Sequence, residues 1–282
     1  VGKKNVNIFN LRFILYFMDK KVLLLIVLIL GIFILNYSFL NSIVVSFFDS
    51  GEEGFIDRVI DGDTVVSNGT SIRLLGINAP ERGEMYSSEA TAFLESFVLN
   101  KTVSVKITGQ DMYKRELAYL FVDGVNVNLE LVRNGFANFY FPSGKDKYYD
   151  NFFSAWGECI EENVNLCTKS LDVCSECVEL FEWDIKNQKV VLRNVCENSC
   201  DLSKWSIKDE GRKKFVLGSG FALGSGNRVE VVVGDEVDSV SLGDSGDVEI
   251  IYWEGKNYVW TEGGDTMFLR DASGGLVLWE SY

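Results

Sequence analysis

The sequence contains no histidine and only two prolines among its 282 residues. Without an imidazole group, neither a histidine general base nor a histidine metal ligand is available to this chain. Acid–base chemistry must therefore come from carboxylates, amines, phenols, thiols or hydroxyl groups. A hydrolase built on this chain is expected to use carboxylates.

Positive charge is also scarce, because 27 Lys and Arg residues face 41 Asp and Glu residues and give a formal net charge of −14. Affinity for nucleic acid comes largely from basic residues that displace counterions from phosphates. The composition therefore disfavours general nucleic-acid binding. If the substrate is a polyanion, a few placed arginines and a metal ion must hold it.

Charged residues are absent from residues 22–48, a run of 27 that exceeds the roughly 20 apolar residues needed to cross a bilayer. Lys20 and Lys21 precede this run, and Asp49 and Glu52 follow it. The positive-inside rule then predicts a single-pass anchor in the cell membrane, with the N-terminus cytoplasmic and the rest extracytoplasmic. The alternative is a signal peptide, cleaved to give a secreted protein, although no clear cleavage site closes the run.

The cysteines all lie within one stretch after the apolar run. They are Cys159, Cys167, Cys174, Cys177, Cys196 and Cys200. An even number in an extracytoplasmic region favours disulfides, and the spacing of the first two suits a local bridge. The two closely spaced pairs that follow also suit a tetrahedral zinc site, so both interpretations stay open.

The chain beyond residue 50 divides into two patterns. Up to about residue 165, short alternating segments predict strands and apolar residues at helical spacing predict helices. The strands are expected at 55–60, 64–69, 71–77, 102–108 and 116–124, and the helices at 87–99, 127–135 and 145–163. This mixture predicts an α+β domain with a small antiparallel sheet or barrel.

From about residue 175 no convincing helix is predicted, and short strands recur at intervals of roughly 8 to 12 residues. They are expected at 178–185, 188–195, 205–210, 228–234, 248–255, 266–271 and 276–282. This spacing indicates an all-β sandwich. Its charges alternate as those of solvated strand faces do.

Candidate chemistry is concentrated in the first strands of the α+β part. Asp61 and Asp63 share one face of a strand, Arg73 lies on a later strand, and Asn78 and Glu81 flank a proline turn. An acidic hairpin would explain the two aspartates alone. The whole set instead suits a hard cation that needs oxygen ligands, a free carboxylate base and an arginine for phosphate.

The segments "VIDGDTV", "RLLGINAPE", "DMYKRELAYLFVDG" and "LELVRNGFA" resemble, in order and spacing, the motifs of the staphylococcal nuclease family over residues 54–165. The resemblance implies an OB-fold barrel with three helices and a Ca²⁺-dependent phosphodiesterase acting on DNA and RNA. By motif position, Asp63, Asn78 and the Ala79 carbonyl would be the calcium ligands. Glu81 would be the general base that activates water.

The same resemblance implies that Arg73 and Arg115 clamp the phosphate. Asp111 and Tyr113 match positions that border the nucleotide, and Tyr140 or Phe141 matches a stacking position. The family usually has aspartate where this chain has an asparagine ligand, and this loss of charge is expected to weaken calcium binding.

The segments "VVLRNVCENSCDLSKWSIKDE" and "YVWTEGGDTMFLRDASGGLVLWESY" resemble the lamin tail domain, an immunoglobulin-like sandwich. This resemblance implies a binding or tethering module with an unidentified partner. Trp205, Trp260 and Asp265 are expected to be core or turn residues without a catalytic role.

The expected organisation is a cytoplasmic N-terminus and membrane anchor over residues 1–50, a staphylococcal-nuclease-like domain over 51–165, and a lamin-tail-like sandwich over 166–282. The fold class is an α+β OB-fold nuclease barrel with helices, an all-β sandwich and an N-terminal transmembrane helix. The expected function is a membrane-anchored extracellular nuclease. The alternative is a non-catalytic protein that keeps the nuclease fold and binds nucleic acid or a surface.

Overall fold

The computed structural model describes residues 51–235 and 248–282, together with positions 21, 22, 25, 28 and 31. The expected membrane anchor over residues 22–48 therefore lies, apart from four of these positions, outside the described residues. Among the residues that are described, no helix is both long and apolar enough to cross a membrane. Residues 51–282 form one unit, and the two folded domains both lie within it.

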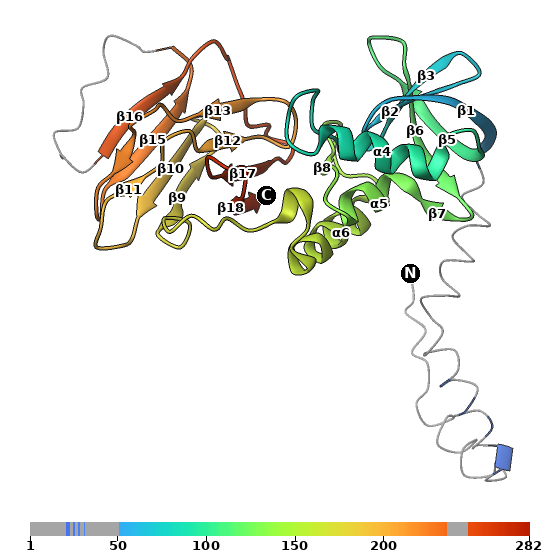
Figure 1. The fold of residues 1–282 in the computed structure, drawn as a ribbon, viewed down its shortest axis with the longest axis horizontal. Coiled ribbons are helices and arrows are strands. Elements are labelled where there is room, and N and C mark those ends of the chain that lie inside the picture. The colour runs from blue at the N-terminus through green and yellow to red at the C-terminus, as the bar shows by residue number, and fades with distance from the viewer. Residues whose placement is uncertain (1–20, 23–24, 26–27, 29–30, 32–50, 236–247) are drawn as a thin grey trace, which may run out of the picture. The chain divides into compact units, whose positions relative to one another are not determined.

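Five strands of the first domain close into a barrel (Figure 1). They are β1 (Glu52–Asp61), β2 (Thr64–Ser67), β3 (Thr70–Leu74), β5 (Thr102–Gln110) and β6 (Glu116–Val122). Neighbouring strands pair antiparallel, and a parallel pairing between β3 and β6 closes the sheet on itself. The β2–β3 turn has positive φ at both Asn68 (49°) and Gly69 (79°), the conformation that an Asn-Gly hairpin favours.

Short elements and helices complete this domain. They are β4 (Gly76–Asn78), β7 (Val125–Asn126), β8 (Asn138–Tyr140), α4 (Ser87–Val98), α5 (Val127–Arg133), α6 (Tyr149–Glu162) and a 3₁₀ turn at Asn165–Cys167. Helix α4 buries Ala90, Leu94 and Val98 along one face, as the sequence predicts. The serines at the start of this segment predict a serine cap, which is wrong: Tyr86, in a left-handed conformation and without a side-chain cap bond, precedes the helix.

The second domain is a sandwich of two four-stranded sheets, with strand orders β16-β15-β10-β9 and β13-β12-β17-β18, and a small β11–β14 pair. The strands are β9 (Val178–Asp184), β10 (Lys189–Asn194), β11 (Cys200–Asp201), β12 (Ser206–Lys208), β13 (Lys214–Val216), β14 (Ala222–Leu223), β15 (Arg228–Val233), β16 (Val248–Trp253), β17 (Thr266–Arg270) and β18 (Leu276–Ser281). Trp205, Trp260 and Asp265 are buried in it, as expected.

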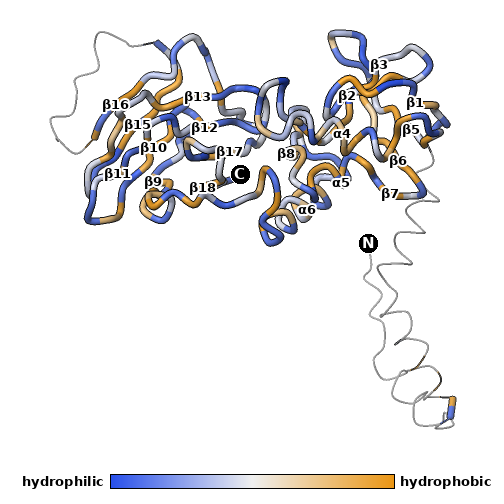
Figure 2. Tube along the Cα trace, in the orientation of Figure 1, coloured by the Kyte–Doolittle hydropathy of each residue, from blue (hydrophilic) through white to orange (hydrophobic). Residues whose placement is uncertain are grey.

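The sheet that contains β12 and β17 has apolar residues on both faces. Ile207 and Leu269 pack into the sandwich core, whereas Phe268, on the opposite face, belongs to the core of the barrel domain. There Phe268 contacts Trp156 of α6, with ring centroids 5.3 Å apart. Hydrophobic residues run along the strands of both domains in Figure 2. The two domains therefore share one hydrophobic contact surface.

The structure contains the expected local disulfide Cys159–Cys167 and a second one, Cys177–Cys196. Cys174 and Cys200 are buried free thiols. Because two cysteines of the proposed zinc site are joined to each other, the described chain does not form a four-cysteine zinc centre.

Candidate active site

A buried ion pair between Asp63 and Arg73 lies at the centre of the site, with Arg73 Nη2 2.9 Å from Asp63 Oδ2. The Ala79 N–H donates to the same oxygen at 3.0 Å, and the Thr64 hydroxyl donates to Oδ1 at 3.0 Å. Burial raises the pKa of Asp63, and the charge of Arg73 opposes that rise. The carboxylate is therefore fixed by three groups. Because it is buried, the binding of a further positive charge to it would be favourable.

A glycine allows this arrangement to form at the β1–β2 turn. A Cβ atom on Gly62 would lie 2.7 Å from the Ala79 Cβ and 2.8 Å from the Ala90 Cβ. Only glycine therefore lets the turn that carries Asp63 approach both Ala79 and helix α4. Asp61, at the same turn, accepts a hydrogen bond from the Asp63 N–H at 3.2 Å and so helps to fix the backbone that carries Asp63.

Asn78 is buried at the end of β4, and its two amide ends have different partners. Its Oδ1 accepts a hydrogen bond from Arg73 Nη2 at 3.3 Å. Its Nδ2 donates to the carbonyl oxygen of Gly211 at 2.8 Å. Gly211 lies between β12 and β13, so the sandwich domain orients a side chain of the barrel domain.

Glu81 follows the proline turn and is about half exposed. Its Oε1 lies 2.8 Å from Nε of Arg212, the residue after Gly211. The Glu81 N–H donates to Glu84 Oε2 at 2.9 Å, which fixes the backbone of the turn. The expected general base is therefore paired with an arginine of the sandwich domain.

Arg115 is held by the loop that precedes β6. Its Nε donates to Asp111 Oδ2 at 2.8 Å, and Asp111 Oδ1 accepts from the N–H groups of Tyr113 and Arg115. Slight burial acts to raise the pKa of Asp111, but these hydrogen bonds hold it below its usual value. The Tyr113 ring is exposed, with the Arg115 guanidinium 5.6 Å from its centroid. Asp111 thus orients the arginine.

One cavity of about 980 Å³ brings several of these groups together. It is lined by the expected residues Arg73, Asp111, Tyr113, Arg115 and Tyr140, and also by Arg212. Burial lowers the pKa of Arg73, and the nearby charges of Arg115 and Arg212 lower it further. Three guanidinium groups therefore line one cavity and act electrostatically on one another.

Oxygen atoms of the kind that bind a divalent cation lie beside this cavity. Asp63 Oδ2 and Asn78 Oδ1 both contact Arg73 Nη2, at 2.9 and 3.3 Å, so these two oxygens lie close together. Carboxylate, amide and carbonyl oxygens are the ligands that calcium prefers. Within the described parts of the chain, no group of three or more Asp, Glu or Cys side chains could hold a metal. The protein would supply few ligands, namely Asp63, Asn78 and the Ala79 carbonyl, and water or substrate the others.

Sequence reasoning missed Gly211 and Arg212. They belong to the run "DEGRKK" at 209–214, which begins at the end of the strand predicted over 205–210 and continues beyond it. The clustering of basic residues there was a detectable signal. Nothing in the local pattern, however, shows that this turn would contact the other domain.

The fold and this cavity define a closed barrel with a cavity lined by arginines, joined to a β-sandwich. Residues 71–168 match the family model described as staphylococcal nuclease homologue, and residues 178–282 match that of the Lamin Tail Domain. The chain therefore carries a staphylococcal nuclease homologue domain followed by a lamin tail domain.

Relatives with nuclease names match the first of these domains. An uncharacterized endonuclease of Escherichia coli O157:H7 is 39% identical over 92 residues, which cover 31% of this chain and 60% of the relative. Endonuclease YhcR of Bacillus subtilis is 35% identical over 126 residues, covering 36% of this chain and 10% of the relative. The thermonuclease of Staphylococcus intermedius is 28% identical over 128 residues, covering 41% and 76%. The chain thus spans 60% of the length of the first relative and 10% of the second, less than two thirds of either.

Proposed function

We propose that this chain is a membrane-anchored extracellular nuclease that uses calcium to hydrolyse phosphodiester bonds of DNA and RNA. The observation that carries the proposal is the convergence of Arg73, Arg115 and Arg212 on one cavity, with the Glu81 carboxylate held against one of them. The nuclease names of the relatives support the same activity.

The arginines bind and stabilise the phosphate in this proposal. Guanidinium groups form paired hydrogen bonds with phosphate oxygens, and they stabilise the extra negative charge that develops in the transition state. Arg73 is fixed by hydrogen bonds to the carbonyls of Leu74 and Ile77 at 2.7 and 3.0 Å, so it needs little reorganisation. Arg115 is similarly fixed by Asp111.

Glu81 takes the proton from the attacking water. Its side chain is 52% exposed, so a water molecule can reach it. A bound calcium ion would supply a positive charge that acidifies this water and so allows an ordinary carboxylate to act as the base.

Arg212 adds a cation that the barrel domain does not itself provide. It pairs with Glu81 through Nε, and within the described residues no partner is recorded for its two terminal nitrogens. These nitrogens can donate to a phosphate in the same cavity. The sandwich domain therefore contributes directly to substrate binding.

A second candidate is a nucleic-acid or surface binding protein that has lost turnover. The Glu81–Arg212 pair favours it, because the arginine occupies one of the two oxygens that could accept the proton. The neutral Asn78 amide favours it too, since it would hold calcium less tightly than a carboxylate.

A cleavage assay distinguishes the nuclease from the binding protein. The purified chain, in detergent, is incubated with plasmid DNA or RNA in the presence of calcium or of a chelator. We expect calcium-dependent cleavage, lowered about 10²- to 10⁴-fold in Glu81→Gln through loss of the base. Glu89→Gln removes an exposed carboxylate from the same domain and is expected to cleave normally. Binding of labelled oligonucleotide without cleavage by the parent chain would support the second candidate.

The proposed anchor over residues 22–48 is tested separately. Cells that express the full chain are lysed, and their membranes are washed with alkaline carbonate. Retention of the chain in the membrane pellet is expected, because an apolar helix across the bilayer resists this wash. Release of the chain into the wash, or its appearance in the medium, would contradict the anchor.

A further inference from the structure

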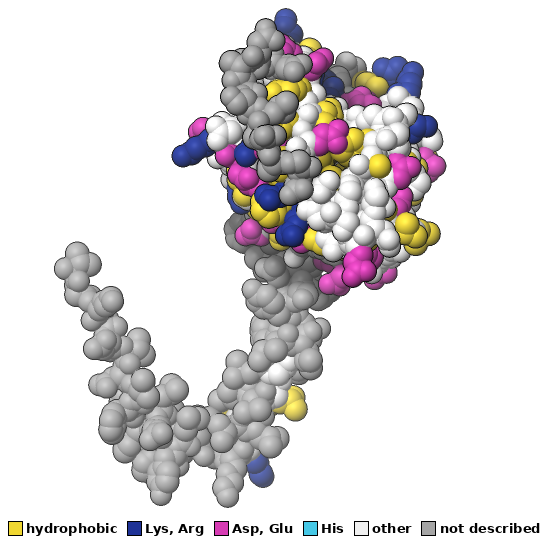
Figure 3. Space-filling model, turned by 90° about the vertical axis from the view of Figure 1, so that its left-hand side faces the viewer, with side chains coloured by type: hydrophobic (Ala, Val, Ile, Leu, Met, Phe, Trp, Pro, Cys, Tyr) yellow, Lys and Arg dark blue, Asp and Glu magenta, His cyan; other side chains and the backbone are white. Residues whose placement is uncertain are grey.

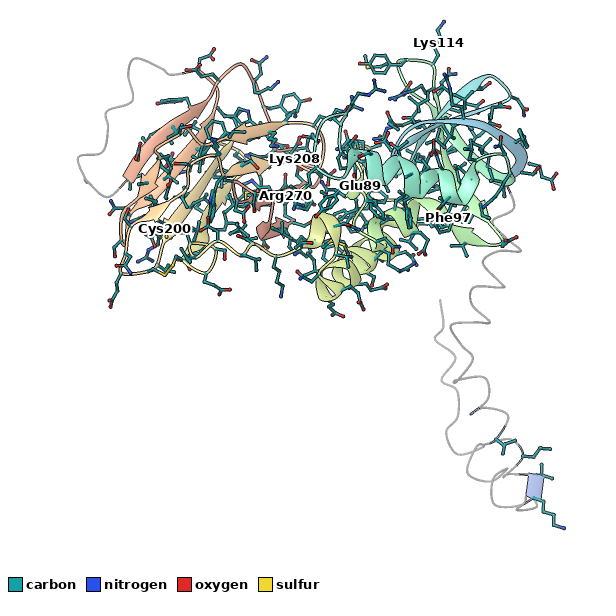
Figure 4. The ribbon with its side chains drawn as sticks, in the orientation of Figure 1. Glu89, Phe97, Lys114, Cys200, Lys208 and Arg270 are labelled. Carbon is teal, nitrogen blue, oxygen red and sulfur yellow. A yellow bond between two sulfur atoms is a disulfide. The ribbon has the colours of Figure 1, made fainter. Side chains whose placement is uncertain are left out.

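The outer face of one sandwich sheet carries basic residues beside its contact with the barrel domain. In the register of β12, β13 and β17, Lys208 lies opposite both Lys214 and Phe268, and Ser206 lies opposite Arg270. These residues share the face on which Phe268 packs against the barrel domain. Figure 4 shows Lys208 and Arg270 close together on this side of the sandwich.

A cleft of about 360 Å³ lies between this face and residues 80–85 of the barrel domain. Its size falls within the range of about 300–1,000 Å³ that is typical of small-molecule sites. Four cationic side chains line it: Lys204, Lys208, Lys214 and Arg270. On the end of the sandwich in Figure 3, by contrast, basic and acidic side chains are interspersed.

Arg270 and Lys208 have fewer hydrogen-bond or ion-pair partners, among the described residues, than buried charged side chains usually have. Arg270 Nη1 donates to the Gly274 carbonyl at 3.1 Å, but Arg270 Nη2 is buried without a hydrogen-bond partner among the described residues. No ion pair is recorded for Lys208 within the same part of the chain. Burial lowers the pKa of Lys208, and it lowers that of Arg270 to about 10.

Two acidic residues, Glu84 and Asp271, also line the cleft and do not balance its four cations. Asp271 accepts hydrogen bonds from the N–H groups of Ser273 and Gly275 at 2.7 and 3.0 Å. Glu84 accepts one from the Glu81 N–H, and its other oxygen lies 3.9 Å from Lys214. The cleft therefore keeps an excess of positive charge that an added anion would neutralise.

We propose that this cleft is a second phosphate-binding site, with Arg270 and Lys208 as its principal ligands. The arginine offers a planar donor group and the lysine a point charge, a combination that suits a tetrahedral oxyanion. The phosphate has two possible sources: a free phosphate or mononucleotide, or the backbone of a nucleic-acid strand that continues from the nuclease cavity. The second source is within reach because Pro80 and Glu84, which line the cleft, flank Glu81.

Titration of the full chain with inorganic phosphate in chelator tests this site without any need for cleavage. Calorimetry and thermal unfolding compare the parent with Lys208→Gln, with Arg115→Ala for the nuclease cavity, and with Lys189→Gln. Lys189 is a matched control in the same domain, ion-paired with Glu182 at 3.4 Å. Lys208→Gln should weaken phosphate binding about 10- to 100-fold, the loss of one charge-assisted hydrogen bond.

The unfolding temperatures also show whether Lys208→Gln acts on phosphate binding or only on the stability of the fold. Without phosphate, Lys208→Gln should unfold at the same or a higher temperature than the parent, because it removes a charge that burial disfavours. In phosphate the stabilisation seen for the parent should be reduced in this variant and persist in Arg115→Ala and Lys189→Gln. If Arg115→Ala abolishes all phosphate binding, or Lys208→Gln leaves it intact, the proposal is wrong.

Oligonucleotides distinguish the two sources. If the strand supplies the phosphate, Lys208→Gln should weaken binding of a ten-nucleotide single strand and leave a dinucleotide unaffected. If free phosphate or a mononucleotide is the ligand, Lys208→Gln should weaken its binding and leave both oligonucleotides unaffected. Failure of the chain to cleave nucleic acid would refute the proposed function but would not alter these binding results.

Discussion

Replacing Asn78 by aspartate tests both the domain contact and the proposed metal site. In the free protein the variant loses the hydrogen bond from Nδ2 to the Gly211 carbonyl, a distance of 2.8 Å. It also places a carboxylate oxygen against that carbonyl in a buried position, and a second negative charge near Asp63. Asn78→Asp should therefore destabilise the metal-free protein, although it restores the residue that the family usually has.

The size of this effect follows from the buried contact. Loss of the bond costs roughly 1 kcal/mol, and the unsatisfied carbonyl costs about 1–3 kcal/mol more, partly offset by attraction to Arg73. A net loss of about 2–3 kcal/mol lowers the Tm of a unit of this size by roughly 4–12 °C. Calcium should then raise the Tm of Asn78→Asp more than that of the parent, since a carboxylate ligand binds it more tightly.

Thermal unfolding followed by circular dichroism, in chelator and then in millimolar calcium, measures both effects. Asn128→Asp is the matched control, because Asn128 is also buried and its Nδ2 donates to the Leu75 carbonyl at 2.8 Å. It should be destabilised without any extra response to calcium. If Asn78→Asp is as stable as the parent in chelator, the Gly211 contact is unimportant. An unchanged response to calcium would refute Asn78 as a ligand.

Three further predictions concern other groups. Arg212→Ala should raise KM about tenfold with little change in kcat, because it removes a phosphate-binding group. Arg193→Ala, which removes an arginine 3.9 Å from Glu179, should change neither constant. A higher kcat in Arg212→Ala would instead show that Arg212 inhibits Glu81. Burial, with the charge of Asp265, raises the pKa of Glu210 from 4.5 to about 8. The folded protein therefore favours the protonated carboxyl group. The stability that this group contributes is fully present below about pH 4.5 and is lost as the pH rises to 8. Urea unfolding across this interval should show a smaller loss of stability for Glu210→Gln, and an equal loss would contradict the shift. The two thiols at Cys174 and Cys200 should react with a thiol reagent only after denaturation, because both are buried and burial raises the pKa of Cys200 to about 12. Four reactive thiols would rule out one of the two disulfides.

Local patterns in the sequence predict most of the strands, because each depends on neighbouring residues. The Asn68–Gly69 turn and the alternation along β17 are examples: Met267 and Leu269 face the sandwich core, and Phe268 faces the other way. The alternation also implies that another part of the chain must bury the side chain of Phe268. It does not say that a helix of the barrel domain supplies it, since that depends on contacts between residues more than a hundred positions apart.

The candidate site divides in the same way. Arg73 and Asn78 lie within five positions of each other, and their contact follows from the strand and turn that connect them. Gly211, which binds the Asn78 amide, lies 133 positions away. The expected serine cap of helix α4 is wrong because two serines in a row, Ser87 and Ser88, do not determine which residue adopts the left-handed conformation before the helix. Long-range packing decided each of the features that the pattern missed.

The asparagine at position 78 is accounted for by the domain beside it. An aspartate there would present two acceptor oxygens, and one of them would meet the Gly211 carbonyl, which can only accept. An asparagine presents an oxygen toward Arg73 and a donor toward Gly211, so it satisfies both partners. The same turn then places Arg212 next to Glu81. The neutral residue at position 78 and the added arginine are therefore two consequences of one contact between the domains. Through this contact the turn of the sandwich binds the Asn78 amide and adds Arg212 to the cavity of the barrel.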